Sequence, residues 1–328
     1  MRTPRYIRAG KPYELILRTR SGLPFVATHY MRLLLDSSLA RAQRDGKVTL
    51  CHYLWMGNHA HMLIVPNDPT MCVNFFQELQ KKIAEYLKLL LGVTHIRLWE
   101  GGAVLAELGT ERDVVAKIAY IYSNPAKANL VDAIEDYPGL STWGRYLCCL
   151  RSVDATMSYE VPWIRRPAVS KLSAPSLSPA EDRAYRDILR AGATKMHTLT
   201  VEPNAWMRAF RIMDAESVTA LNARALQLMR EMEQEHRRNR GSKPVYGRDA
   251  LQVADITKEH TPSPRERRVF IITSDNELRM SYIAMVRAFA RRCRECYLLY
   301  KEGMVTEISW PPGAFRPHLR PRASMVVL

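Results

Sequence analysis

The sequence contains few cysteines and no long apolar run, and these two absences narrow the class of protein. Six cysteines occur in 328 residues, and the pairs Cys148-Cys149 and Cys293-x-x-Cys296 lack the spacing of a zinc finger. We therefore expect reduced thiols. No uninterrupted apolar stretch approaches the roughly 20 residues of a membrane-spanning helix, and the start MRTPRYIRAGKPYE lacks the apolar core of a signal peptide. These absences predict a cytoplasmic protein with no membrane partner.

Acidic residues are also scarce relative to basic ones. The chain carries 48 Lys and Arg against 33 Asp and Glu, which gives a net charge of +15 and a pI near 9.7. Residues 1–150 hold 18 basic and 13 acidic side chains, a net charge of +5, which leaves +10 for 151–328. Arginine dominates the second part and suits bidentate phosphate contacts. The excess positive charge predicts a polyanionic partner, most simply nucleic acid.

Two histidines lie two positions apart in the apolar run WMGNHAHMLIVP. Successive side chains of a strand point to opposite faces, so His59 and His61 project from the same face. A single histidine on an apolar strand is more often a satisfied core residue than a ligand. Two neighbouring imidazoles favour a metal site instead.

A tyrosine and an asparagine lie one helical turn apart in AYIYSNPAKANLV. The four-residue spacing puts the Tyr120 phenol and the Asn124 amide on one face of the helix. Tyr122 lies about 200° around the helix from Tyr120, so only one of the two phenols can face the histidines. The spacing favours Tyr120, and we interpret Tyr122 as a packing or DNA-stacking residue. An asparagine before a proline also serves ordinary helix ends, which is the alternative role for Asn124.

These residue types together have the chemistry of phosphodiester cleavage. A cation that neutralises a non-bridging oxygen lowers the barrier to attack on phosphorus. A tyrosine nucleophile forms a covalent phosphotyrosine, which divides one difficult transfer into two easier ones. A free phenol titrates near ~10, so we expect a nearby cation to favour the phenolate during attack. Two imidazole nitrogens and one amide oxygen suit Mg²⁺ or Mn²⁺, although imidazole also binds zinc.

The segments HYLWMGNHAHMLIVP, YIYSNPAKANLV and DYPGLSTW resemble, in order and spacing, the single-tyrosine HUH transposases, and most closely the REP-associated tyrosine transposases. The resemblance covers about residues 5–150. It implies a metal-dependent endonuclease that carries out DNA transposition and recombination on single-stranded DNA, with REP-like hairpins as ligands. Tyr120 would be the catalytic nucleophile, and His59, His61 and Asn124 would bind the divalent metal ion. Such an enzyme would be associated with the nucleoid through its DNA.

Members of that family act as monomers or as homodimers, and in some dimers the tyrosine helix serves the partner's histidines. The sequence does not decide between these arrangements. Two other functions stay open. The chain could be a catalytically silent DNA-binding regulator with the same fold, although the intact histidines and tyrosine argue against that. It could also be a non-catalytic RNA-binding module, which would leave the histidine pair unexplained.

The order of the predicted elements indicates an α+β fold over residues 1–155, with an antiparallel sheet and helices on one face. The resemblance implies the HUH, ferredoxin-like form of this architecture. We predict strands at 13–20, 49–56, 61–65 and within 96–107, the last with a turn at Gly101-Gly102, and helices at 29–44, 71–91 and 111–124.

The rest of the chain is predicted as a connector, 156–179, rich in Pro, Ser and Arg, followed by a basic, mainly helical region, 180–328, of uncertain role. Within that region we expect helix over 180–240, a polar loop over 241–266, a strand near 269–275 and a helix at Arg279–Tyr300. The arginines of 310–324 could line a nucleic-acid groove or belong to a solvated tail. The basic residues that we predict as nucleic-acid contacts, with a solvated surface as the alternative, are Lys81, Lys82, Lys127, Arg237 and Arg238.

Overall fold

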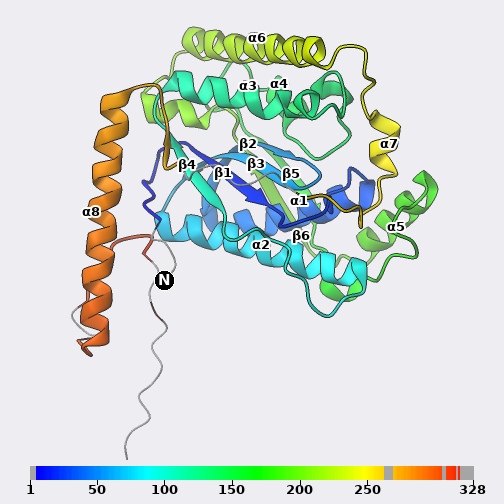
Figure 1. The fold of residues 1–328 in the computed structure, drawn as a ribbon, viewed down its shortest axis with the longest axis horizontal. Coiled ribbons are helices and arrows are strands. Elements are labelled where there is room, and N and C mark those ends of the chain that lie inside the picture. The colour runs from blue at the N-terminus through cyan, green and yellow to red at the C-terminus, as the bar shows by residue number, and fades with distance from the viewer. Residues whose placement is uncertain (1–4, 262–268, 305–307, 315–316, 318–328) are drawn as a thin grey trace, which may run out of the picture.

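A computed structural model describes residues 5–261, 269–304, 308–314 and 317, and Figure 1 shows its architecture. Within this part of the chain, one five-stranded sheet has the order β2-β3-β1-β4-β7. Its strands are β1 (Tyr13–Arg18), β2 (Val48–Trp55), β3 (His59–Pro66), β4 (Val104–Leu108) and β7 (Ile271–Ile272). All pairs are antiparallel except β4 and β7. The fold is therefore mixed α+β with an antiparallel-dominated sheet, as predicted.

Helices cover both faces of this sheet, whereas the sequence predicts helices on one face (Figure 1). The helices are α1 (His29–Gln43), α2 (Pro69–Leu91), α3 (Glu111–Lys127), α4 (Trp143–Leu147), α5 (Pro179–Ala191), α6 (Ala215–Arg240), α7 (Arg248–Gln252) and α8 (Asn276–Lys301), with 3-10 turns at Arg44–Gly46, Ile134–Asp136, Arg166–Ala168 and Ala205–Phe210. Helices α1 and α2 pack on one face, and α3, α4 and α6 cover the other.

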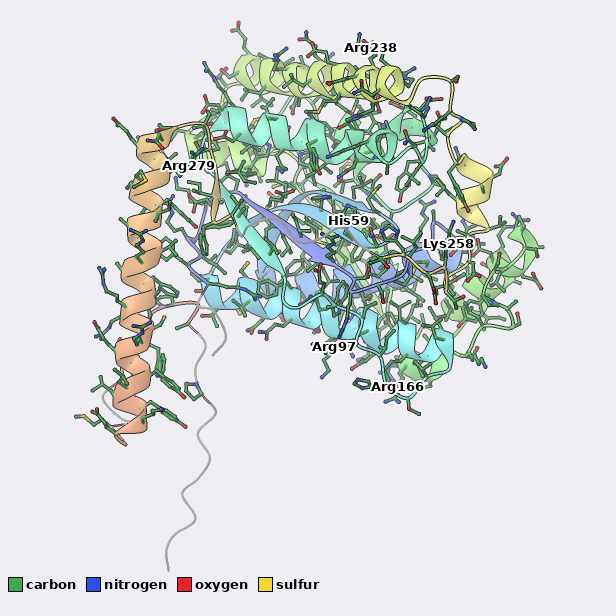
Figure 2. All side chains as sticks on the ribbon, viewed as in Figure 1. His59, Arg97, Arg166, Arg238, Lys258 and Arg279 are labelled. Carbon is green, nitrogen blue, oxygen red and sulfur yellow. The ribbon has the colours of Figure 1, made fainter. Side chains whose placement is uncertain are left out.

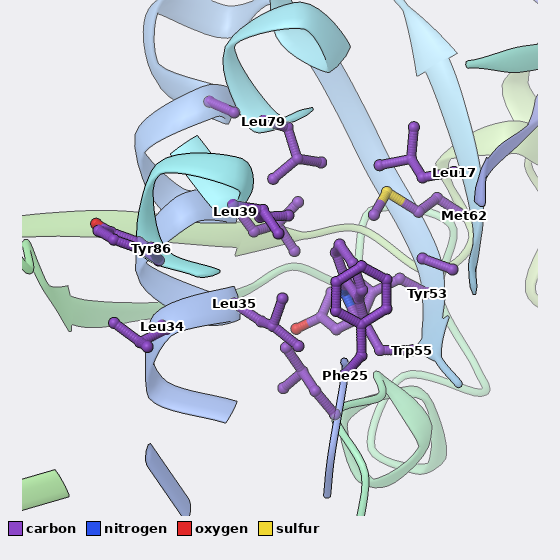
Figure 3. Packing of buried hydrophobic residues seen from close by; sticks show 14 of the residues in the cluster. Leu17, Phe25, Leu34, Leu35, Leu39, Tyr53, Trp55, Met62, Leu79 and Tyr86 are labelled. Atoms are coloured by element: carbon purple, nitrogen blue, oxygen red, sulfur yellow. The ribbon is translucent and has the colours of Figure 1, made fainter. Parts of the chain in front are cut away.

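The strand β3 explains why helices are needed on both sides. Its residues Ala60, Met62 and Ile64 join the core under α1 and α2, while Leu63 and Val65 join the core under α3. Because both faces of the strand are apolar, each must be covered from water. Figure 3 shows part of the first core, in which side chains from the sheet meet those of α1 and α2.

Local sequence signals set the ends of the two long helices near the sheet. Asp68 caps α2 by accepting hydrogen bonds from the backbone of Thr70 and Met71, and Gly92 ends it at a φ of 66°. A capping box between Thr110 and Asp113 begins α3. These boundaries agree with the predicted ones to within two residues.

The end of α3 differs from the prediction. We expected the helix to stop near Asn124, because a proline disfavours helical backbone in the residue before it. The helix instead continues through the buried Pro125 to Lys127. The carbonyls of Asn124 and Pro125 are satisfied by the backbone amides of Ala128 and Leu130, at 2.9 Å each. The additional turn carries Lys127 along the same helix as the tyrosine.

The segment predicted as a connector contains a strand. Residues Met157–Pro162 form β5, which pairs antiparallel with β6 (Met196–Val201), a strand inside the region predicted to be helical. Both strands lie against α1, where the Gln43 amide donates to the Thr200 carbonyl and accepts from the Thr200 amide. This pairing joins segments about 40 residues apart, so no local periodicity could reveal it. The division into domains at 156–179 stays a prediction.

The basic region also supplies helices that pack on the first 155 residues. The predicted helix at Arg279–Tyr300 is confirmed as α8, whereas the predicted strand near 269–275 shortens to β7. Helix α6 lies along α3, and its Arg240 forms an ion pair of 2.7 Å with Asp132 (Figure 1). The polar segment after α6 contains the short helix α7.

The strand predicted within 96–107 narrows to β4, because Trp99 forms an isolated bridge with Thr19 and the chain then bends at residues 100–102, where Gly101 has a φ of 89° that favours glycine. All six cysteines are free, as expected for reduced thiols. None of the described helices combines the length and the apolar composition needed to cross a membrane. Of the predicted groove arginines, Arg316, Arg320 and Arg322 lie outside the described residues.

Candidate active site

The histidine pair lies on the face of the sheet that α3 covers. Across the antiparallel pairing of β1 and β3, His61 lies opposite Ile16 and His59 lies opposite Arg18. The two imidazole rings have centroids 5.0 Å apart. The alternation expected for a strand therefore holds, and both rings share one face.

The Nδ1 atom of each imidazole forms a hydrogen bond with a neighbouring oxygen. The His61 Nδ1 lies 2.9 Å from Oε1 of Glu14, and the His59 Nδ1 lies 2.7 Å from Oδ1 of Asn58. A carboxylate or amide oxygen only accepts, so each Nδ1 must carry the hydrogen. The Nε2 atom of each ring is then the position where a proton or a cation can bind. Metal-binding histidines in proteins are commonly held in this way.

Burial and charge set the protonation of this cluster. Burial, reinforced by the charges of His61 and Arg18, lowers the pKa of His59 to about 3, so this imidazole is neutral at pH 7. Burial alone would raise the pKa of Glu14, but its hydrogen bonds and charge interactions with His61 and Lys117 outweigh that effect and lower it. The Lys117 Nζ lies 2.8 Å from Glu14 Oε2. Glu14 is therefore an ionised carboxylate between His61 and Lys117.

The phenol of Tyr120 lies beside this cluster. Its ring centroid is 5.5 Å from that of His61, with the two planes at 87°. Lys117 and Lys127 place their Nζ atoms 4.6 and 4.8 Å from the centre of the Tyr120 ring. Lys127 also donates a long hydrogen bond of 3.5 Å to the Tyr120 oxygen. Two cations therefore lie next to a half-buried phenol, where they stabilise negative charge that develops on its oxygen.

Asn124 follows Tyr120 by one turn of α3. Its side chain is 6% exposed, and among the described residues its amide nitrogen has no hydrogen-bond partner. Buried amides nearly always have partners, so within the described chain this nitrogen is an unused hydrogen-bond donor. The structure brings Asn124 onto the tyrosine helix, but within the described residues it shows no hydrogen bond between Asn124 and either histidine.

Tyr122 belongs to a buried polar cluster on the other side of α3. Its hydroxyl lies 2.8 Å from His52 Nδ1 and 2.9 Å from the Thr142 hydroxyl, and its ring stacks on Tyr146. The side chain is 1% exposed. Tyr122 therefore packs the core, and its burial leaves no face on which DNA could stack.

A cavity of about 1890 Å³ opens beside these groups and is lined by His59, His61, Tyr120, Glu14 and Lys117. None of the five basic residues predicted as nucleic-acid contacts lines this cavity. Lys81 and Lys82 lie on α2, and Lys82 pairs with Glu85 at 2.9 Å. Arg237 and Arg238 are exposed near the end of α6, the helix that packs on α3, and Figure 2 labels Arg238 there. Of these five, Lys127 is the one that contacts Tyr120.

Two residues of the cluster, Glu14 and Lys117, were not predicted as site residues from the sequence. Glu14 is a carboxylate inside the otherwise apolar strand YELILR, and Lys117 precedes Tyr120 by one helical turn. Both signals are visible in the sequence. Their meaning depends on the register of β1 against β3, which places Glu14 diagonally from His61.

The histidine pair offers two imidazole nitrogens to a divalent metal ion, and Asn124 on the neighbouring helix offers an amide oxygen. Within the described part of the chain, no group of three or more His, Cys, Asp and Glu side chains is arranged around one point. A metal bound here would take the two histidine Nε2 atoms and the amide oxygen of Asn124, because the amide nitrogen, unpartnered among the described residues, is a donor and does not bind cations. Such an open, incomplete set leaves positions for substrate and water.

No family model matches the chain, and no curated protein matches it. A solved structure of a REP-associated tyrosine transposase bound to a REP hairpin aligns with 44% of this chain and 83% of its own chain. The aligned residues are 19% identical, and the TM-score is 0.38. This likeness is too distant to support a function, which must rest on the residues described above.

Proposed function

We propose that the protein is an HUH-type single-tyrosine DNA transposase, an endonuclease that cleaves and rejoins single-stranded DNA through Tyr120. The observation that carries this proposal is the contact between the Tyr120 ring and His61, whose Nδ1 is held by Glu14. A nucleophile beside a pair of oriented imidazoles that could hold a metal ion is an arrangement suited to phosphodiester cleavage.

In the proposed step, the Tyr120 oxygen attacks a backbone phosphorus and loses its proton. A new bond forms between the tyrosine oxygen and phosphorus, one backbone P–O bond breaks, and the departing sugar oxygen takes up a proton. Lys127 holds the Tyr120 oxygen by its hydrogen bond and stabilises charge there. Reversal of the step with a different sugar hydroxyl rejoins the strand.

His59, His61 and Asn124 would hold the Mg²⁺ or Mn²⁺ ion, which when bound supplies positive charge at a non-bridging phosphate oxygen. Glu14 fixes the ring orientation of His61, and Asn58 fixes that of His59. All the groups named in the proposed step lie within residues 1–155, the predicted catalytic domain. The basic region, 180–328, would support this domain and contact DNA.

The test is incubation of the protein with labelled single-stranded DNA from the sequences flanking its own gene, including their hairpins, in the presence of Mg²⁺ or Mn²⁺. We expect a labelled protein band that resists denaturation and that is absent from Tyr120→Phe. Hairpin binding without such an adduct, under all divalent ions tried, would favour the DNA-binding regulator instead.

A further inference from the structure

Residues 243–260, which follow α6 and include α7, contribute several residues to the lining of the cavity, and we call this segment the strap. At one end, the Tyr246 and Gly247 amides donate to the carbonyls of Asn129 and Leu130, just after α3, at 2.9 Å each. The strap leaves the layer of α3 and α6 and descends through α7 (Figure 1).

The other end of the strap is fixed to the segment that follows β1. The Gly22 amide donates to the His260 carbonyl at 2.9 Å, and the Leu23 amide donates to the Lys258 carbonyl at 3.2 Å. The strap residues that line the cavity are Tyr246, Leu251, Ala254, Asp255, Lys258 and His260. One wall of the candidate active site therefore comes from a part of the chain more than 120 residues beyond Tyr120.

Two strap residues form an aromatic and cationic pair inside this wall. Lys258 places its Nζ atom 5.1 Å from the centre of the Tyr246 ring, although 12 positions separate them in sequence. Tyr246 is nevertheless 46% exposed. Gly247, at a φ of 91°, follows Tyr246 at a turn that residues with a side chain rarely adopt. The backbone at Tyr246 is thus fixed, while a large part of the Tyr246 side chain stays exposed to solvent.

The size and charge of the cavity favour an extended anionic ligand. Its volume of about 1890 Å³ exceeds the roughly 300 to 1,000 Å³ of pockets for single small molecules. The charged residues that line it are Arg5, Arg18, Lys117 and Lys258 against Glu14 and Asp255. Glu14 is paired with Lys117, and Arg18 is paired with Glu100 at 3.3 Å, and the formal charge of the other three, Arg5 and Lys258 against Asp255, is positive.

We propose that Tyr246 and Lys258 form a stacking subsite for one unpaired base of the single strand that occupies the cavity beside Tyr120. The proposal rests on the proposed function, because it assigns the strap to the same substrate. Every base presents a π face to an aromatic ring, whereas bases inside a duplex are already stacked on their neighbours. The Lys258 ammonium would contact the phosphate next to the stacked base. Figure 2 labels His59 and Lys258, both of which line the cavity.

The test measures binding without cleavage. A fluorescently labelled oligo(dT) strand is titrated with the full-length protein in EDTA and followed by anisotropy. We expect Tyr246→Ala to weaken binding about 5- to 150-fold, which at 1.4 kcal/mol per decade corresponds to about 1 to 3 kcal/mol, the range for stacking of one base. Tyr246→Phe retains the ring and should bind within about twofold of the wild type.

Tyr297 provides a matched control. Its ring also lies under a lysine, Lys301, at 5.5 Å, but on α8 and away from the residues that line the cavity. Tyr297→Ala should leave oligo(dT) binding unchanged. A strand of the same length that consists of abasic sites should bind the wild type and Tyr246→Ala equally, since it offers phosphates without bases.

Unchanged oligo(dT) binding by Tyr246→Ala, or an equal loss for the abasic strand, would overturn the subsite. An equal loss for Tyr297→Ala would also overturn it. The adduct assay tests the proposed function separately. If the wild type forms the adduct and Tyr246→Ala binds oligo(dT) normally, the subsite proposal is wrong and the transposase proposal stands. If Tyr246→Ala loses oligo(dT) binding but the wild type forms no adduct, the transposase proposal is wrong and the subsite proposal stands.

Discussion

Lys127 reaches the phenol of Tyr120 from two turns further along the same helix, with its Nζ atom 3.5 Å from the tyrosine oxygen. The contact exists because α3 continues through Pro125 instead of stopping before it. The lysine is exposed and therefore keeps its charge, and it approaches the oxygen that would carry negative charge during attack. This pair links the end of the helix to the proposed nucleophile.

Lys127→Gln should slow formation of the covalent adduct about tenfold while DNA binding changes little. An enclosed electrostatic donor contributes roughly 10²- to 10³-fold to rate, and solvent screening reduces this for an exposed lysine. Single-turnover rates at saturating DNA measure the effect. Lys81→Gln, an exposed lysine on α2, is the control, and an equal loss of rate there would remove the specific role of Lys127.

Tyr120→Phe should abolish the adduct with nearly intact DNA binding, because the hydroxyl alone is lost. Tyr122→Phe should keep most of the activity but lower the thermal stability, because it leaves the buried His52 Nδ1 without its partner and removes one of the partners of the Thr142 hydroxyl. Gel analysis of labelled DNA and thermal unfolding measure the two effects. An adduct formed by Tyr120→Phe and missing in a folded Tyr122→Phe would reverse the assignment.

Glu14→Gln should weaken binding of Mn²⁺ about 10- to 100-fold, the usual effect of removing a group that orients a histidine ligand. The variant keeps the shape of the side chain but loses the charge that faces His61 and Lys117. The double variant His59→Ala and His61→Ala should bind no Mn²⁺, which calorimetry can measure without DNA. Full cleavage in excess EDTA would instead show that both histidines are structural.

Stability should fall in mild acid because of two buried histidines, His59, whose pKa is also lowered to about 3, and His52, which is 0% exposed and whose contribution can be isolated. Burial lowers the pKa of His52 from 6.5 to about 3, partly opposed by the Pro203 carbonyl. As the pH falls below about 6.5, His52 of the unfolded chain binds a proton that the folded protein does not, so its contribution lowers the free energy of unfolding by about 1.4 kcal/mol per pH unit until about pH 3.

Urea unfolding of the wild type and of His52→Gln across this range measures the contribution. Burial raises the pKa of Asp36 to about 6, which stabilises the folded state as the pH falls from about 6 to 4 and opposes His52. The difference between the wild type and the variant removes this opposing effect. Parallel stability curves for the two proteins would show that His52 does not titrate as expected.

The sequence predicts those parts of the molecule that depend on local periodicity. Alternation is enough to put His59 and His61 on one face, and the four-residue spacing from Asn124 selects Tyr120 over Tyr122. The contact between Glu14 and His61 needs the register of two strands that lie about 40 residues apart. The extent of α3 depends on tertiary packing around Pro125, which overrides the usual effect of proline.

The strap shows the same limit at a larger scale. Its sequence is polar and without period, so it predicts a loop, and α7 is the one regular element that the structure finds in it. Its place beside the cavity is set by backbone hydrogen bonds to residues 22–23 and 129–130. Such contacts involve no side-chain pattern, and the sequence alone therefore gives no sign of them.

The contact between His61 and Tyr120 also bears on how many polypeptides one cut requires. Both residues come from the same chain, so the contact that carries the proposed function needs no second polypeptide. Mixing the double variant His59→Ala, His61→Ala with the variant Tyr120→Phe should then restore no cleavage, since the intact residues of one protein do not complete the site of the other. Each strand scission would be first order in a single subunit, and joining two DNA ends would require two complete centres rather than one that is shared.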